Sequence, residues 1–533
     1  MSTVSATLYA SLIILALGWL RALFGRPRDD MHRVPGPPKS IASWIWGHEL
    51  LAHVHEPNHM YTTWVKAYGS AVRIKAALFH PDILLVTDHA AVHHVLGDVK
   101  DYIKSPGVVP HVASMLGKGL PWAEGAEHRF QRRILSPAFT PDSVKGMADA
   151  IFECAENIEH RLTGQVPHGP DGTVVDMTEY CSSVTLDVIG RVGFGHDFGA
   201  SAGPVLSPSA TDARAIFDAW KGHIQQSFTF LAFLGPLILR AFPKITSTYL
   251  FMPAQGKSKL LVKKLARRFV DAAEQGADVE KGKDILSILL RAGKDGQGKD
   301  AEKLTDEQIL DNINTFTIVG HDTTASVLDF TFLELARHPE MQRKLREEIL
   351  SSGQSLTYDT IQDFPYLDAV VKEGLRLHAS VPAIERVALK DDIIPLHKPI
   401  RVTDGTPLEA LHISKGQVLL FPVLTMQRNP AVWGADAALF RPERWLTPGG
   451  VPPPGELPHT WSGLMAFSEG PRTCIGYRLA VLEMKVILAT LIRGLEFHDT
   501  GAQVREHMLP TLTALTDGRG GYLPLRVTLA GKD

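Results

Sequence analysis

Apolar residues recur at helical spacing, without a proline, from Asp306 to about Arg337, which predicts one unusually long helix. Thr305 precedes this run and Gln308 lies three residues further on, a pair typical of a capping box at a helix start. Pro339 predicts the end of the helix, because proline cannot continue it. At 1.5 Å per residue such a helix is about 48 Å long, enough to cross a whole domain.

Two further helices are indicated by the same spacing. One covers residues 366–378, and the other begins after Gly476 with an amphipathic run. No Gly/Ser linker, long charge run or internal repeat divides the interior of the chain. We therefore expect one large domain, residues 41–533, in preference to the three or four that a length of 533 residues suggests.

The amino-terminal residues are mostly apolar over positions 4–20, and Arg21, Arg26 and Arg28 follow them. Positive charges after an apolar run favour an uncleaved anchor with the following domain on the cytosolic side. The alternatives are a signal peptide or a surface helix, since the run is short for a span of about 20 residues. We expect an anchor and its flank in residues 1–33, then a stiff proline-rich hinge in residues 34–40.

A second apolar stretch covers residues 228–242 and is interrupted by Gly235 and Pro236. It is too broken to span a membrane. Two interpretations stay open, a helix of the core and an element that dips into lipid beside a substrate channel.

Composition excludes several classes of protein. A net charge of −3 gives no electrostatic case for nucleic-acid binding. Three cysteines make no disulfide framework, and both Cys154 and Cys181 look like structural helix residues. No phosphate-binding loop or dinucleotide fingerprint is present, so redox chemistry needs electrons from another protein.

The third cysteine, Cys474, lies in the segment Phe467-Ser-Glu-Gly-Pro-Arg472-Thr-Cys474-Ile-Gly476. A lone thiolate near a cation and backbone N–H groups can stay ionised and ligate iron. Glycines on both sides of it let the backbone pass close to a flat group. The helix expected after Gly476 places its positive end near the sulfur.

The pattern F-x-x-G-x-R-x-C-x-G resembles, at every fixed position, the haem-binding signature of the cytochrome P450 family. The resemblance implies that Cys474 ligates the iron of haem b and that Arg472 pairs with a haem propionate. Phe467 would pack near the sulfur. It also implies a mainly α-helical fold with a smaller β-rich region, the haem lying between the long helix and the Cys474 loop.

The middle of the long helix reads Val319-Gly320-His-Asp322-Thr323-Thr, which breaks ordinary helix preferences. Such a departure favours a functional segment. It resembles the oxygen-activation motif of the same family. That resemblance implies that Thr323 hydrogen-bonds dioxygen, that Asp322 relays protons, and that Gly320 lets the helix lie close to the haem. Val319 departs from the usual alanine or glycine and narrows the distal pocket.

Supporting residues of the family have counterparts here too. Glu373 and Arg376 share a helix face, and with Arg444 they resemble its buried ion network, although Trp445 stands where phenylalanine is usual. The resemblance implies further cations for the haem propionates, and these are His128, Arg132 and Arg386.

The resemblance, strongest to fungal members, implies a haem-dependent monooxygenase that inserts one oxygen atom from O2 into a lipophilic substrate. Terpenoids, fatty acids and xenobiotics are the candidate classes. Electrons would come from NADPH-cytochrome P450 reductase, alone or with cytochrome b5, at the endoplasmic reticulum membrane. The alternatives are a haem-thiolate isomerase or dehydratase, which needs no proton relay such as Asp322, and a non-catalytic haem protein of the membrane.

Overall fold

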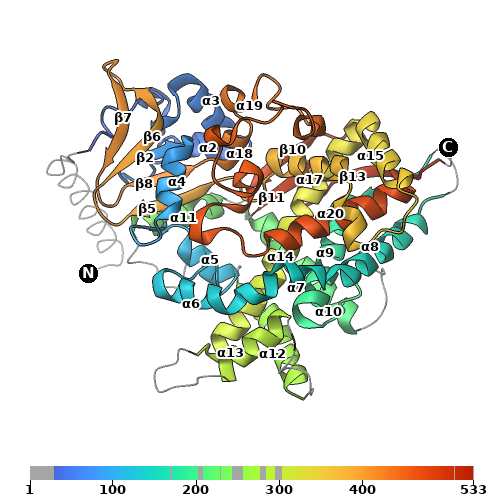
Figure 1. Cartoon of the computed structure of the whole chain (residues 1–533). Helices are drawn as coiled ribbons and strands as arrows, with labels where there is room; N and C mark the ends of the chain where they lie inside the picture. The colour runs from blue at the N-terminus through green and yellow to red at the C-terminus, as the bar shows by residue number, and fades with distance from the viewer. Residues whose placement is uncertain are drawn as a thin grey trace.

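The computed structural model describes most of the chain: residues 29–167, 171–201, 208–227, 230–242, 256–275, 282, 284–294, 303–508 and 511–531. Helices dominate it, and a smaller set of strands lies partly beside the helices of the amino-terminal third, on the left of Figure 1. The expected mainly α-helical fold with a smaller β-rich region is confirmed.

The α-helices are α2 (Glu49–Val54), α3 (His59–Tyr68), α4 (His89–Gly97), α5 (Val109–Met115), α6 (Gly125–Leu135), α7 (Pro141–Lys145), α8 (Ala148–Thr163), α9 (Met177–Phe194), α10 (Pro208–Ser227), α11 (Phe230–Ala241), α12 (Gly256–Gln275), α13 (Ile285–Lys294), α14 (Asp306–Arg337), α15 (Pro339–Ser351), α16 (Tyr358–Gln362), α17 (Pro365–Leu377), α18 (Val423–Gln427), α19 (Pro430–Trp433) and α20 (Tyr477–Gly494). Short 3₁₀ turns are η1 (Lys39–Ile41), η2 (Ser136–Phe139), η5 (Pro442–Trp445), η6 (Pro454–Glu456), η7 (Trp461–Gly463), η8 (Met465–Phe467) and η9 (Gly470–Arg472).

The strands are β1 (Ala71–Ile74), β2 (Ile83–Val86), β3 (Tyr102–Lys104), β4 (Thr173–Asp176), β5 (Ile384–Ala388), β6 (Asp392–Arg401), β7 (Pro407–Ile413), β8 (Val418–Phe421), β9 (Leu495–Asp499), β10 (Val504–Met508), β11 (Leu512–Thr516), β12 (Arg519–Gly520) and β13 (Pro524–Leu529). The largest sheet has the order β1-β2-β8-β5-β3, so β8 and β5 from the second half of the chain lie between strands from the first half. Its β3–β5 ladder places Lys104 directly opposite Arg386.

Helix α14 runs through the core and begins and ends where the sequence predicts. The Thr305 side chain accepts from the Gln308 backbone N–H, and the Gln308 side chain accepts from that of Thr305, so the capping box is confirmed. Most α14 residues are buried, because α9, α12, α17 and α20 all pack against it. A helix covered on all sides in this way is a central element and not a surface one.

The amino-terminal segment is bound to the domain from residue 29 onward. The N–H of Asp30 donates to the carbonyl of His412 on β7, and the N–H of Arg73 on β1 donates to that of Pro35. Gly36 leaves no room for a Cβ, because the Arg73 carbonyl lies there. The proline-rich segment is thus extended, and it is hydrogen-bonded to β1 and packed against it. The apolar run 4–20 lies outside the described residues, and within them no helix has the length and apolarity to cross a membrane.

Helix α11 forms the described part of the second apolar stretch, and it packs on the region around α2. Phe233 and Leu237 are buried there, and the Phe233 ring lies 4.5 Å from that of His53. Buried Arg240 pairs with Glu49 at 2.5 Å and with Glu385 at 3.3 Å. One face of α11 therefore belongs to the core, as the first of the two interpretations predicts.

Glu373 is the centre of a fully buried ion network. Its carboxylate accepts two hydrogen bonds of 2.8 Å from Arg376 and one of 2.9 Å from Nε of Arg444. The three side chains are at most 1 % exposed. The indole N–H of Trp445 donates to the same carboxylate at 3.0 Å, which a phenylalanine could not do. The tryptophan therefore adds a donor to the network.

Replacing Glu373 with glutamine should destabilise the protein by about 3–5 kcal/mol, because Arg376 then stays buried without a paired carboxylate and Arg444 keeps only Asp436, at 3.4 Å. The measurement is the free energy of unfolding in denaturant. Asp359→Asn is the matched control, since the Lys145–Asp359 pair is more than half exposed on both sides and such pairs contribute about 0–1 kcal/mol. Equal losses in the two variants would contradict the expectation.

Candidate functional site

The loop that carries Cys474 lies between η9 and α20 and is held at both of its ends. The N–H of Cys474 donates to the Phe467 carbonyl at 2.8 Å. The Phe467 ring packs edge-on against Trp461 and obliquely against Tyr477. Nη1 of Arg132, on α6, donates to the Thr473 carbonyl at 2.6 Å. The cysteine is thus presented on a loop that both neighbouring elements hold in place.

Cys474 is an exposed residue, but many protein atoms lie near its thiol and affect the pKa of that group. Burial raises the pKa of the thiol, while the Gly476 N–H and the Arg132 guanidinium lower it. A bound metal cation would complete the deprotonation of the thiol, because a thiol that coordinates a metal ion is present as the thiolate. The local donors therefore suit a thiolate ligand.

Positive side chains from four parts of the chain gather beside this loop. We call them the cationic cluster: Lys104, His128, Arg132, Arg386 and Arg472. Glu124 accepts hydrogen bonds from Arg472 and lies 3.4 Å from Nζ of Lys104. The structure thus brings together the four propionate partners that the sequence analysis expected, and adds a lysine and a glutamate to them.

The cationic cluster is under electrostatic strain in the protein alone. Burial, followed by the charges of Lys104, Arg472 and Arg132, lowers the pKa of His128 to about 4. Burial likewise lowers the pKa of Lys104 to about 8 and, together with Arg472, that of Arg386 to about 10. A group that brings negative charge would relieve this repulsion.

The cationic cluster and Cys474 together fit a cysteine-ligated haem. The Nε atoms of Arg386 and Arg472 are buried and have no hydrogen-bond partner, so each still has a donor to offer. A haem supplies two carboxylates for such donors and an iron for the thiolate. The residues that would hold it are Cys474 at the metal and the cationic cluster at the carboxylates.

Asp322 and Thr323 lie half-buried in the middle of α14. The indole N–H of Trp220, on α10, donates to one carboxylate oxygen of Asp322, and the hydroxyl of Thr511 to the other, each at 2.5 Å. The Thr323 hydroxyl donates to the Val319 carbonyl at 2.8 Å. The carboxylate is thus fixed by donors from two other elements, and the threonine oxygen remains able to accept a hydrogen bond.

The structure shows a packing reason for glycine at position 320. A Cβ on this residue would lie 2.7 Å from Cγ1 of Ile189 on α9. The side of α14 that the glycine leaves bare therefore faces α9, and the glycine serves close helix–helix packing.

The two glycines of the cysteine motif differ in the same respect. A Cβ on Gly470, whose φ is +72°, would collide with the Leu96 carbonyl at the end of α4. A Cβ on Gly476 would lie 3.6 Å from the Phe139 ring, an ordinary contact. Protein packing therefore requires glycine at position 470 but not at position 476.

Four residues of the site were not predicted: Lys104, Glu124, Trp220 and Thr511. Lys104 reaches the site because β3 pairs with β5. Trp220 reaches it because α10 packs beside α14, and Thr511 because the segment before β11 does the same. No local pattern marks these residues, since their positions depend on strand register and helix packing. For Glu124 a signal existed: an acidic residue directly before the helix α6, whose last turn is basic.

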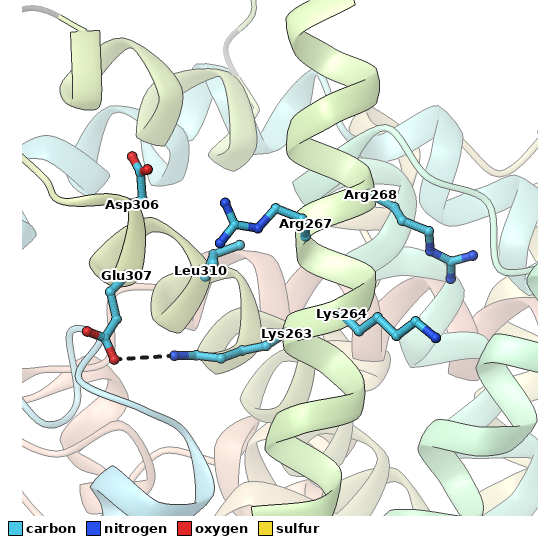
Figure 2. A pocket seen from close by; sticks show the side chains of 7 residues that line it. All are labelled: Lys263, Lys264, Arg267, Arg268, Asp306, Glu307 and Leu310. Carbon is cyan, nitrogen blue, oxygen red and sulfur yellow. Dashed lines mark ion pairs between the residues drawn. The ribbon is translucent and has the colours of Figure 1, made fainter.

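A recess between α12 and α14 is a second candidate for a ligand site, and Figure 2 shows its lining: Lys263, Lys264, Arg267, Arg268, Asp306, Glu307 and Leu310. Lys263 lies 3.7 Å from Glu307 and 2.6 Å from Asp311. Its charged side chains suit no apolar ligand, and it lacks the residues of either motif. The chemistry is therefore better placed at Cys474 and α14.

Comparison with known proteins places this geometry in context. The family model described as Cytochrome P450 matches residues 35–520. Cytochrome P450 monooxygenase 205 of Postia placenta is 31 % identical over 88 % of this chain and 86 % of its own. Cytochrome P450 monooxygenase claO of Ampulloclitocybe clavipes is 31 % identical over 97 % of both chains. Ganoderic acid synthetase CYP5150L8 of Ganoderma lucidum is 31 % identical over 92 % of this chain and 93 % of its own.

Gly320→Ala should destabilise the protein by about 1–2 kcal/mol, because the collision with Ile189 outweighs the gain of up to about 1 kcal/mol in helix propensity. In an Ile189→Ala background the same substitution should be neutral or stabilising, since the colliding atoms are gone. A double-mutant cycle on the free energy of unfolding measures this coupling. Additive effects would show that Gly320 does not face Ile189.

Proposed function

The chain belongs to the cytochrome P450 family and is a haem-dependent monooxygenase, and on this basis we propose that Cys474 is the cysteine that ligates its haem iron. The observation that carries the proposal is the place of this thiol beside the cationic cluster, whose Arg132 donates to the Thr473 carbonyl and counters the rise that burial causes in the pKa of Cys474. The haem is haem b, and Arg472, Arg386, Arg132 and His128 bind its propionates.

The charges of the cationic cluster support this assignment. Lys104, although absent from the family pattern, shares the β3–β5 ladder with Arg386 and offers a further ammonium group. Glu124 pairs with both Lys104 and Arg472, so these two side chains point toward the same carboxylate. The cluster therefore binds and orients the carboxylate edge of the cofactor by charge-assisted hydrogen bonds.

When bound, the haem supplies the reductive activation of O2 and the transfer of one oxygen atom to the substrate. The protein supplies the proton chemistry. The Asp322 carboxylate would be the proton acceptor, and hydrogen bonds from Trp220 and Thr511 hold it in place. Thr323 relays a proton, since its hydroxyl can break the hydrogen bond to the Val319 carbonyl and donate in another direction. Both side chains are half-buried, so water reaches them in limited amounts.

Electrons come from an NADPH-dependent reductase, alone or with cytochrome b5. Helix α6 supports this, because Arg132 contacts the Cys474 loop while Arg129 and Arg133 of the same helix are exposed. Exposed cations beside the loop suit an acidic partner protein, and complementary charge speeds such an encounter.

The membrane side of the domain lies near its amino-terminal part. Several large apolar side chains are exposed there: Ile41, Trp44, Ile45, Phe79 and Phe230. Trp44 is 70 % exposed and packs against Phe79. Contiguous exposed apolar side chains indicate a surface that meets lipid or another protein. We place the enzyme at the endoplasmic reticulum membrane, with an anchor in residues 1–33, a hinge in 34–40 and the catalytic domain in 41–533.

The substrate is a lipophilic molecule. One relative is named a ganoderic acid synthetase, so terpenoids are the first class to screen, followed by fatty acids and xenobiotics. Product masses that increase by one oxygen atom, in microsomes that contain the reductase and NADPH, test the function itself.

Cys474→Ala should abolish both the haem-thiolate absorbance of the reduced carbon monoxide complex and the oxygenated product, because the iron loses its protein ligand. Cys154→Ala is the matched control, since this buried thiol lies on α8, away from the Cys474 loop. Product formation in the Cys474 variant at the level of the parent enzyme would overturn the assignment.

Asp322→Asn should lower kcat by about 10²-fold or more with little change in KM, because a proton relay contributes about 10²–10⁴-fold and substrate binding is untouched. Haem content, read from the carbon monoxide spectrum, should not change.

The matched control for this variant is Asp329→Asn on the same helix. Burial raises the pKa of Asp329 to about 8, so its carboxyl is mostly neutral near pH 7 and an amide resembles it. The control should keep its kcat. A similar loss in both variants would mean that α14 is merely disturbed by the amide.

A further inference from the structure

Two histidines and a glutamate converge where α4 meets the loop that leads to Cys474, outside the site described above. His93 belongs to α4, His459 lies between η6 and η7, and Glu469 directly precedes η9. One ligand atom from each residue lies within 4.8 Å of the other two. Imidazole nitrogens and a carboxylate oxygen in this number form known zinc centres with an open fourth position.

The distance between the two histidine nitrogens matches that of two ligands on a shared ion, whereas the glutamate accepts a direct hydrogen bond from His93. The Nδ1 atoms of His93 and His459 lie 3.3 Å apart. Two nitrogens bound to a tetrahedral ion at about 2.0–2.1 Å lie about 3.3 Å from each other. Nδ1 of His93 also lies 2.6 Å from Oε1 of Glu469, so its one proton has two competing neighbours. A cation between the three atoms would satisfy all of them.

Glu469 provides a second and independent sign of a ligand. The residue is only 2 % exposed, and its Oε2 is buried without any hydrogen-bond partner. Leaving a buried acceptor unpaired costs about 1–3 kcal/mol, and more when the group is charged. The same carboxylate meets His93 through its other oxygen. An ion at this place would neutralise the carboxylate and use its free lone pairs.

Two further histidines lie close to this group without joining it. His89 and His397 lie next to the group, with ring centroids 4.2 Å apart. Burial and the proximity of His397 and His459 lower the pKa of His89. Neither His89 nor His397 has a ligand atom in the converging set, so both serve as neighbours for comparison.

We propose that His93, His459 and Glu469 bind a divalent transition-metal ion of the zinc type, with solvent at the fourth position because both histidines are exposed. The ion would join α4 to the segment that leads into the Cys474 loop. The site is distinct from the haem, and it does not depend on the monooxygenase function.

The test uses the full-length, tag-free holoenzyme after chelator treatment and dialysis against Zn²⁺. We expect one zinc ion per chain by elemental analysis and a saturable calorimetric titration. The temperature of unfolding should rise with zinc concentration, as linkage requires for an ion that binds only the folded chain. The carbon monoxide spectrum verifies that the haem is retained in every sample.

The variants separate this site from general binding of zinc by surface histidines. His93→Ala, His459→Ala and Glu469→Gln should each weaken zinc binding by about tenfold or more, as loss of a ligand or its support does. His89→Ala and His397→Ala should bind zinc like the parent enzyme. His459 is exposed, so its variant folds even where the Glu469 variant does not.

Three outcomes would overturn the proposal. The first is the absence of stoichiometric zinc in the parent enzyme. The second is unchanged affinity in the His93 and His459 variants. The third is an equal loss in the His89 and His397 variants, which would indicate diffuse binding by neighbouring imidazoles.

Discussion

A single buried carboxylate, that of Glu373, fixes the relative positions of the two helices on either side of the site. It pairs with both Arg376 and Arg444, and Asp436 lies 3.4 Å from Arg444 as a second carboxylate, so α17 cannot shift relative to the η5 segment without separating buried charges. Helix α17 in turn packs against both α14 and α20. Gly374, the next residue, leaves no room for a Cβ because Thr331 of α14 occupies that position. The helix that carries Asp322 and Thr323 and the helix that follows Cys474 thus share one support.

The cationic cluster shows the opposite arrangement of charge. Here the protein gathers basic side chains from a strand pair, a helix and a loop, and burial, followed by the charges of Lys104, Arg472 and Arg132, lowers the pKa of His128. Repulsion of this kind weakens the folded protein alone and strengthens its affinity for an anionic group. Folding and cofactor binding are therefore linked, since whatever neutralises the cluster also stabilises the fold.

Features encoded by neighbouring residues could be predicted from the sequence, and features that depend on distant contacts could not. The limits of α14 follow from Thr305, Gln308 and Pro339, all within or beside the helix, and they were found to the residue. Lys104 and Trp220 reach the site through strand pairing and helix packing, which no local pattern records. Gly320 is instructive, because its presence was expected while its reason lies on α9.

The fastening of the proline-rich segment along β1 has a mechanical consequence. The Pro35 carbonyl is bonded to β1, and β1 leads through β2 and β8 to β5, which carries Arg386. A force applied at residue 29, where the described chain begins, is therefore transmitted through hydrogen-bonded strands to Arg386. The segment from Asp30 to Pro35 and this sheet therefore move together, so a displacement of Pro35 also displaces Arg386.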